Sequence, residues 1–385
     1  MLRKRRVLCH FLYLISCFLI IWILFIKYTY YSVGKKLMFP ASWKPPESCH
    51  SNVSAFATIW GSYLQQRVEI QQPLLYTISS QLCTEKFYPD FESNIRKVIN
   101  YDILHNAPCF ENEIVGEDIY FVNAVTEDVP VIVTAGSSNH FYEIQALFKS
   151  IHTKLIPLYK NLKVIFYDIG LSENENSAMK KHCNCEVRLF PFKQFPPHIG
   201  LINAYAWKPL IIFDVLKQYK FVMWLDACIR FRDLEIKHNL DTIFRRTKSI
   251  GIQLQKSPRW IVSNHTKPDT FTILNEVECL FDYPELESGW LLVWKNSFTM
   301  HSIIRPWVGC ALTEHCMTHP YPSFLRPCSN DLWKFLLRTR CHRFDQSVLN
   351  IILIRIFNIQ RKLIEFDGTE IAEILRDNKE NYFPS

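Results

Sequence analysis

The sequence predicts an α/β fold in which a mixed, mainly parallel sheet is flanked by helices. Short apolar runs that indicate strands alternate with segments of helical spacing. The strands are expected at residues 131–135, 162–168 and 183–190, and the helices between them at 141–151 and 172–181. This alternation favours a parallel sheet with right-handed crossovers.

A single carboxylate ends the most apolar of the expected strands. A helix predicted over residues 209–219 leads into the run FVMWL, which stops at Asp226. In open α/β sheets, ligands bind outside the carboxyl ends of the strands. We therefore expect a site at Asp226, although a carboxylate at a strand end can also be purely structural.

The N-terminus predicts a membrane anchor. Residues 7–26 carry no charged side chain, and as a helix they would reach about 30 Å, the thickness of a bilayer core. The basic residues within 1–6 predict a short cytosolic tail, which places everything after Lys27 on the luminal side. Tyrosines instead of a small-residue cleavage site follow the span, which favours an uncleaved anchor over a signal peptide.

A luminal location predicts disulfides. Of thirteen cysteines, two lie in or beside the span, which leaves an odd number, eleven, beyond it. At least one should stay free, and Cys228 is the candidate. Cys183 and Cys185 should pair elsewhere, because alternate residues of a strand lie about 7 Å apart. The cysteines and histidines between Cys310 and His342 match no familiar zinc spacing, so disulfides are favoured there too. Asn52 and Asn264 begin glycosylation sequons that fit the same compartment.

Beyond the anchor we expect a stem over residues 27–127 and one domain over 128–385. The stem segment has several prolines and no sustained period. The formal net charge is +7, and part of it sits in the N-terminal basic cluster. This excess gives only a weak case for nucleic acid, which we do not expect as a partner, whereas a modestly basic luminal face suits an anionic small substrate.

The turn after the first expected strand is a candidate nucleotide site. It consists of Ser137, Ser138, Asn139 and His140. A strand, turn and helix start leave backbone N–H groups free to meet a phosphate or a base. The alternative is an ordinary turn, because no glycine-rich phosphate motif is present. Asp168, at the end of the next strand, could receive a ribose hydroxyl or could simply form its turn.

A set of motifs carries a family resemblance. In chain order they are VTAGSSNHF, FYDIGLS, CNCEVRLFPF, YAWKPLI, WLDACIRF, ESGWLLVWKN, WVGCAL and CHRFDQSVLN. Together they resemble a family of animal type II membrane proteins related to nucleotide-diphospho-sugar transferases, whose substrates are mostly unassigned. The resemblance spans roughly residues 129–357. It implies a GT-A type glycosyltransferase fold behind the anchor and stem, a nucleotide-sugar donor, a glycan or glycoconjugate acceptor, and a Golgi membrane location.

The resemblance also implies a manganese ion, which GT-A enzymes usually hold with two carboxylates one residue apart. This chain has Asp226-Ala227-Cys228, and a thiol is a poor ligand for a hard cation. Three explanations remain open: an ion held by Asp226 and a distant ligand such as His342, neutralisation of the diphosphate by Lys208 and Arg230, or loss of activity. Lys208 follows Trp207 at the start of a helix, where it could approach a phosphate or remain solvated.

The remaining candidates belong to the acceptor side. Glu287 precedes Gly289 and an expected strand, so it could remove a proton from an acceptor hydroxyl or merely form a turn. Asp345 could close the site or cap the helix expected over 348–357. His265 and Gln346 are candidate substrate contacts. The alternative to an enzyme is an inactive luminal protein on the same fold that binds glycans or acts as a scaffold.

Overall fold

The computed structural model describes residues 53–70, 83–108, 129–233, 236–318, 328 and 341–384. The expected tail 1–6, the expected anchor 7–26 and the sequon at Asn52 lie outside these residues. Within the described ranges, no helix combines the length and the apolar character needed to cross a membrane.

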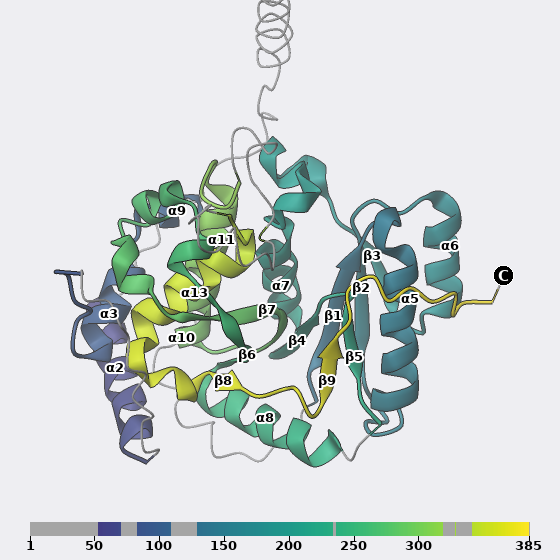
Figure 1. Cartoon of the computed structure of the whole chain (residues 1–385), viewed down its shortest axis with the longest axis horizontal. Helices are drawn as coiled ribbons and strands as arrows, with labels where there is room; N and C mark the ends of the chain where they lie inside the picture. Colours follow the sequence, from purple (N-terminus) through teal and green to yellow (C-terminus); the bar gives the residue numbers. More distant parts are fainter. Residues whose placement is uncertain are drawn as a thin grey trace, which may run out of the picture. The chain divides into compact units, whose positions relative to one another are not determined.

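A seven-stranded sheet forms the centre of the fold, in the order β3-β2-β1-β4-β7-β6-β8 (Figure 1). The strands are β1 (Val131–Gly136), β2 (Val164–Asp168), β3 (Glu186–Leu189), β4 (Phe221–Leu225), β6 (Ile252–Ile261), β7 (Pro284–Trp294) and β8 (Glu365–Phe366). Strands β1 to β4 pair in parallel, and β7 pairs antiparallel with both β4 and β6. The predicted mixed, mainly parallel sheet is confirmed. A small second sheet joins β5 (Ile229–Phe231) to β9 (Ala372–Ile374) in antiparallel fashion.

Helices cover both faces of the sheet. On one face lie α5 (Phe141–Ser150), α6 (Glu173–His182) and α8 (Ile236–Ile250), whose apolar side chains join sheet residues such as Phe166 and Met223 in one core. The other side holds α7 (Trp207–Gln218), α11 (Arg305–Leu312) and α13 (Phe344–Phe357), which pack on one another and on β4 and β7. Burial of both faces explains why the central strands β1, β2 and β4 are mainly apolar.

Local sequence signals set the boundaries of these elements. Ser172 caps α6 by accepting from the Glu175 amide, while the Glu175 carboxylate accepts from the Ser172 amide. This reciprocal pair satisfies donors that would otherwise stay unpaired at the helix start. The predicted strands and helices between residues 131 and 190 are confirmed to within a few residues.

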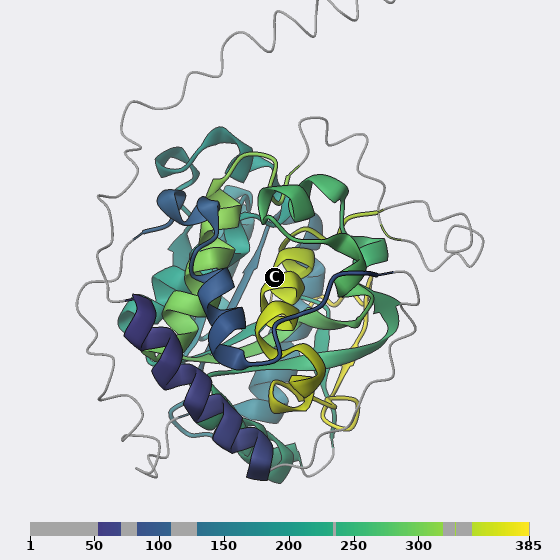
Figure 2. The same ribbon diagram turned by 90° about the vertical axis from the view of Figure 1, so that its left-hand side faces the viewer.

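Part of the segment expected to be a stem is helical and packs on the domain. Helices α2 (Val53–Ile70) and α3 (Phe91–Val98) lie side by side, and α3 contacts α13 (Figure 2). Trp60 donates to Ser297 at 3.1 Å, and a disulfide joins Cys83 to Cys279. Two separate helices of this length give no period that runs through the whole segment, which is why the sequence predicts an irregular stem.

The disulfides correct one prediction and confirm another. Cys183 and Cys185 are bonded to each other, with their Cα atoms 5.1 Å apart. Our expectation that they pair elsewhere was wrong because they do not form a strand: Cys183 ends α6, and Asn184 turns the chain with a φ of 47°. Among the described cysteines, Cys228 alone is free, as predicted.

The segment from Cys310 to His342 holds disulfides where we had weighed a zinc site. The bonded pairs are Cys310–Cys316 and Cys328–Cys341. A thiol bound in a disulfide is not available to a metal, which removes both pairs as zinc ligands.

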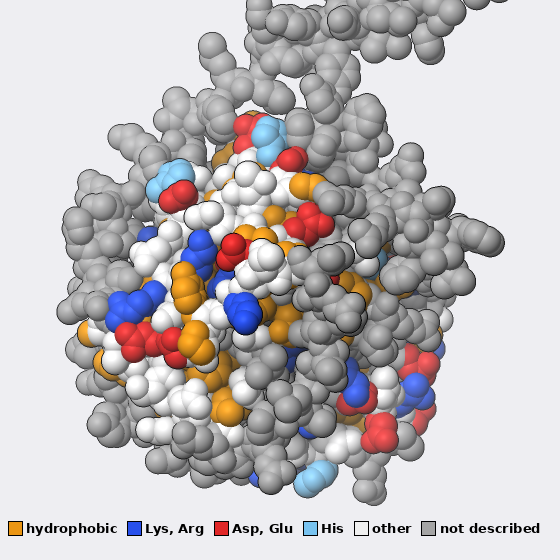
Figure 3. Space-filling view, turned by 60° about the vertical axis from the view of Figure 1, so that its left-hand side comes forward, with side chains coloured by type: hydrophobic (Ala, Val, Ile, Leu, Met, Phe, Trp, Pro, Cys, Tyr) orange, Lys and Arg blue, Asp and Glu red, His pale blue; other side chains and the backbone are white. Residues whose placement is uncertain are grey.

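Charges of both signs are interspersed on the face drawn in Figure 3, where hydrophobic side chains lie between them. A mixed surface of this kind is typical of soluble protein exteriors. The chemistry of the chain is therefore better sought in its buried charges than on this face.

Gly251 tests the packing between β6 and the segment after β7. Its φ is 103°, and a Cβ there would lie 2.3 Å from the Thr299 methyl group. We expect Gly251→Ala to lower the free energy of unfolding by about 2 kcal/mol or more, since it adds backbone strain to a steric clash. Gly200→Ala is the matched control, because a Cβ there would meet no atom within 4 Å. Urea denaturation checks this, and equal midpoints for the two variants would contradict it.

Candidate functional site

A pocket of about 220 Å³ opens at the carboxyl ends of β1 and β4. Strand β1 pairs with β2 on one side and with β4 on the other, so the chain reverses its direction of winding between β1 and β4. Such a switch point leaves a crevice, which is where open α/β sheets bind ligands. The lining includes Ser137, Asn139, His140, Trp207, Asp226 and Arg376.

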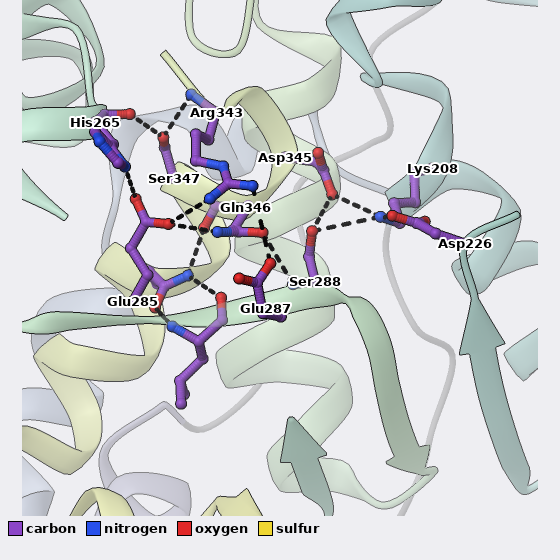
Figure 4. Close-up of polar contacts among 12 residues, drawn as sticks. Lys208, Asp226, His265, Glu285, Glu287, Ser288, Arg343, Asp345, Gln346 and Ser347 are labelled. Atoms are coloured by element: carbon purple, nitrogen blue, oxygen red, sulfur yellow. Dashed lines mark hydrogen bonds and ion pairs between the residues drawn. The ribbon is translucent and has the colours of Figure 1, made fainter. Parts of the chain in front are cut away.

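Behind this pocket, a buried lysine joins two carboxylates (Figure 4). Lys208 Nζ lies 3.0 Å from Asp226 Oδ1 and 3.1 Å from Asp345 Oδ2. The Lys208 and Asp345 side chains are 2% and 6% exposed, whereas that of Asp226 is 39% exposed. The predicted proximity of Asp226 and Asp345 is thus present, and Lys208 is not a solvated helix-start residue. Ser288 adds a hydrogen bond to Asp345 Oδ2 at 2.8 Å.

Lys208, Asp226 and Asp345 form a triad, and their surroundings shift the pKa values of Lys208 and Asp345. Burial lowers the pKa of Lys208, but the carboxylates of Asp226 and Asp345 outweigh it and raise that pKa above its ordinary value. Burial raises the pKa of Asp345, and the adjacent Lys208 only partly opposes the shift. The ammonium therefore stays charged between the two carboxyl groups.

Asp226 presents its second oxygen toward the strand β7. The Trp224 indole donates to Oδ1 at 2.7 Å. A Cβ at Gly289 would lie 2.8 Å from Oδ2. Glycine is thus required at position 289 for the carboxylate of Asp226 to lie where it does. This is a physical reason for the glycine in the motif ESGWLLVWKN.

The described residues around Asp226 do not assemble a set of metal ligands. Among them, the group of three such side chains close enough to share an ion is His265, Cys328 and Cys341, and its cysteines form a disulfide. Burial raises the pKa of the Cys228 thiol to about 12, which keeps it protonated and a poor ligand. The described side chains around Asp226 therefore make a poor site for manganese.

His342 does not serve as a second metal ligand in this arrangement. One ring nitrogen accepts from the Lys267 amide at 3.4 Å, and the other pairs with the Met317 carbonyl at 3.1 Å. With both nitrogens engaged and the ring 2% exposed, it holds two loops together.

The turn after β1 lies partly in the pocket. Ser137, Asn139 and His140 line it, whereas Ser138 does not and instead donates to Glu175. Ser137 donates to Asn139 at 2.6 Å. His140 pairs with Glu143 at 2.8 Å, and this hydrogen bond raises the pKa of His140.

Asp168 forms the turn after β2 and does not line the pocket. Its Oδ1 accepts from the amides of Gly170 and Leu171, each at 2.8 Å, and its Oδ2 accepts from Asn176 at 2.5 Å. Both oxygens are satisfied within the protein. Of the two interpretations left open by the sequence, the turn-forming one describes this structure.

Arg230 also has a different role from the expected one. Its guanidinium donates to backbone carbonyls of Ala227, Ile229, Glu143 and Asn378, and to the Asn378 side chain. Every nitrogen is used, so this residue cannot also neutralise a diphosphate without losing these bonds.

Asp345 is not the cap of α13. The N-cap is Arg343, and Asp345 lies in the first helical turn, where it faces Lys208 and Ser288. The capping interpretation was wrong because the helix begins earlier than residue 348. Being buried, Asp345 is placed to hold Lys208 and not to contact an acceptor.

A second buried network lies beside the triad (Figure 4). At its centre, Glu285 accepts from Gln346 at 2.6 Å and pairs with Arg343 at 3.2 Å and with His265 at 2.8 Å. His265 and Gln346, our candidate substrate contacts, are thus engaged within the protein. Asn264, in contrast, is exposed, so its glycosylation stays a prediction.

Glu287 is the partly exposed carboxylate of this region. It lies within β7, not in a turn before it, and its side chain is 14% exposed with the nearest Arg343 nitrogen 3.9 Å away. Sequence reasoning missed Glu285, Ser288 and Arg376. Ser288 could have been found from its place between Glu287 and Gly289, but nothing in the polar C-terminal segment distinguishes Arg376.

Comparison with known proteins gives a family of unassigned role and distant structural neighbours. Residues 110–213 match the model of a family described as a protein of unknown function, DUF1647. No curated protein matches the chain.

Several solved structures of glycosyltransferases are similar to the chain. The mannosyltransferase Ktr4p from S. cerevisiae shares 11% identity at a TM-score of 0.41, over 82% of this chain and 86% of that one. Mouse xyloside xylosyltransferase 1 shares 10% at 0.34, over 62% and 84%. The bifunctional glycosyltransferase WbbM shares 14% at 0.33, and the match spans 48% of this chain but only 35% of WbbM. Scores this low carry no activity over, so the site itself must support any function.

Removal of the buried cation tests the triad. Lys208→Met leaves two neighbouring carboxylates without their partner, and we expect the free energy of unfolding at pH 7 to fall by about 3–5 kcal/mol. Lys217→Met is the control, because Lys217 lies on the same helix with a side chain that is 56% exposed.

The pH dependence of that variant has a definite sign. Without Lys208, the already raised pKa of Asp345 should rise further. A carboxyl group whose folded pKa exceeds its unfolded value stabilises the fold at low pH and loses that contribution as pH rises through the folded pKa. Relative to wild type, the variant should regain stability from pH 7 toward pH 4 in urea titrations. A constant difference across that range would contradict the assignment.

Proposed function

We propose that this chain is a glycosyltransferase of GT-A type that moves a sugar from a nucleotide-sugar donor to a glycan or glycoconjugate acceptor. The observation that carries the proposal is the pocket at the β1–β4 switch point, into which a fixed carboxylate, Asp226, opens. Ionised groups held rigidly at the mouth of a pocket are typical of catalytic sites. Lys208 holds one oxygen of Asp226 from behind, which fixes the direction of the carboxylate at the pocket.

The donor occupies the switch-point pocket. The lining of this pocket includes polar groups, on Ser137, Asn139 and His140, and the flat aromatic rings of Tyr205 and Trp207. A nucleoside combines a planar base with ribose hydroxyls, so it matches a pocket that has both kinds of wall. Asp226 then lies on the sugar side, fixed by Lys208 and Trp224.

Glu287 is the group proposed to act on the acceptor. In an inverting transfer it takes the proton of the acceptor hydroxyl while the oxygen bonds to the sugar and the bond to the diphosphate breaks. In a retaining transfer it would only hydrogen-bond a sugar. Its place on β7, two residues before the glycine that contacts Asp226, supports a role near the transferred sugar.

We place this reaction in the Golgi lumen, with the chain held by residues 7–26 as a single-pass type II membrane protein. Disulfides at eight of the nine described cysteines support an oxidising compartment. A glycan at the exposed Asn264 would fit the same location.

The second candidate is a luminal protein that binds glycans or nucleotides without turnover. Asp226-Ala227-Cys228 favours it, because a second carboxylate is absent where manganese-dependent GT-A enzymes have one. Binding of a nucleotide sugar with neither hydrolysis nor transfer would select this alternative.

Replacement of Asp226 tests the site. Asp226→Asn should lower nucleotide-sugar hydrolysis and transfer by at least about 100-fold, since it removes a fixed charge at the reacting sugar. The fold should survive, because the amide oxygen can still accept from Trp224 and Lys208, and Asp345 still pairs with the ammonium. Asp214→Asn, at a half-exposed carboxylate on α7, is the control. Assay of the full chain across a panel of UDP-, GDP- and CMP-sugars gives the measurement, and unchanged activity would show that the site is misplaced.

Replacement of Glu287 tests the proton acceptor. Glu287→Gln should lower kcat by about 10²- to 10⁴-fold in an inverting transfer while the KM for the donor changes little. Glu370→Gln, at an exposed position, serves as the control. Activity of this variant close to that of wild type would remove Glu287 as the base.

A further inference from the structure

The reaction proposed above gives no role to an arginine that lines the donor pocket. Among the described residues that line it, Arg376 is the one with an arginine or lysine side chain. Arg376 is exposed, and no hydrogen bond or ion pair joins its guanidinium to another described residue. It therefore remains available to a ligand, unlike Lys208 and Arg230.

The backbone on both sides of Arg376 is fastened to the floor of the pocket. The Leu375 amide donates to the Cys228 carbonyl at 2.8 Å, directly after the Asp226 turn. The Asp377 amide donates to Glu143 at 3.2 Å. These bonds hold Arg376 in the lining of the pocket that Asp226 also lines, and not at the free end of a tail.

The rest of the C-terminal segment is bound along α5. Arg230 donates to both the side chain and the carbonyl of Asn378. Further on, the amides of Tyr382 and Phe383 donate to Gln145, each at 2.8 Å, and Phe383 is buried. Figure 1 shows this segment, in yellow, leaving β9 and passing α5. The bonds of Arg230 thus explain its burial: it holds the segment that carries Arg376.

We propose that Arg376 binds the diphosphate of the donor and takes the place of a divalent metal ion in this pocket. The inference rests on the proposed function and extends it to the charge of the leaving group. A guanidinium presents a planar fork of donors that matches two phosphate oxygens. The poor fit of the residues around Asp226 to manganese leaves this role to a protein cation.

The chemistry balances without a metal. As the bond between the anomeric carbon and the phosphate oxygen breaks, its electron pair stays on that oxygen, and the acceptor oxygen bonds to the anomeric carbon. The acceptor proton passes to Glu287, so the products are the glycosylated acceptor and the nucleoside diphosphate. Arg376 stabilises the negative charge gained by the diphosphate, which is where preorganised charge lowers a barrier most.

The test measures binding of UDP, GDP and CDP to the purified full-length protein by calorimetry, in EDTA and in manganese. We expect the diphosphate that binds wild type to bind equally well in EDTA. Arg376→Ala should weaken it by at least about tenfold while the affinity for the matching nucleoside stays unchanged. Arg376→Lys should retain part of the affinity because it keeps the charge but loses the fork.

Lys379→Ala is the matched control, since it removes one positive charge from the same segment at a side chain that does not line the pocket. Equal diphosphate affinities of Arg376→Ala and wild type, or binding that EDTA abolishes, would overturn the inference while leaving the transferase proposal standing. A wild-type protein that binds none of the diphosphates in either condition would overturn both.

Discussion

The architecture of this site depends on one buried ammonium group held between two carboxylates. Removing such ions from water costs several kcal/mol each, and only close, well-oriented contacts offset that cost. Lys208 comes from α7, Asp226 from the end of β4 and Asp345 from the first turn of α13. A shift of any of these elements would leave a buried charge unpaired. The triad therefore fixes the relative position of three elements, and with it the direction of the Asp226 carboxylate.

The second network explains why the start of α13 stays in place. Phe344 has a φ of 47°, an unfavourable backbone conformation for a bulky residue immediately before Asp345. Arg343 and Ser347 on either side bond the backbone of His265, while Glu285 binds the Arg343 side chain. Strain of this kind persists only where surrounding contacts outweigh it, and it is common at functional sites. The Glu285 network thus supports the triad from outside the pocket.

The sequence predicted the sheet because its central strands are buried on both faces and alternate with segments of helical spacing. It also located Asp226, since the end of an apolar run marks the edge where ligands bind. It could not predict partners that depend on distant segments. The burial of Lys208, the carbonyls around Arg230 and the position of Arg376 all follow from contacts across more than a hundred residues or between separate elements. Periodicity reports which face a side chain is on, not what it meets there.

The chain has Cys228 where GT-A enzymes usually have a second carboxylate, and the charges around this position account for the difference. Cys228 is buried and close enough to Asp226 for that carboxylate to raise the pKa of the thiol, after burial itself. A carboxylate at this position would add a second negative charge beside Asp226, whose partner Lys208 is already shared with Asp345. A divalent ion at Asp226 would share this carboxylate with the Lys208 ammonium, which lies 3.0 Å from Oδ1. A pocket with a lysine behind its aspartate thus favours a neutral residue at 228 and a separate cation for the ligand.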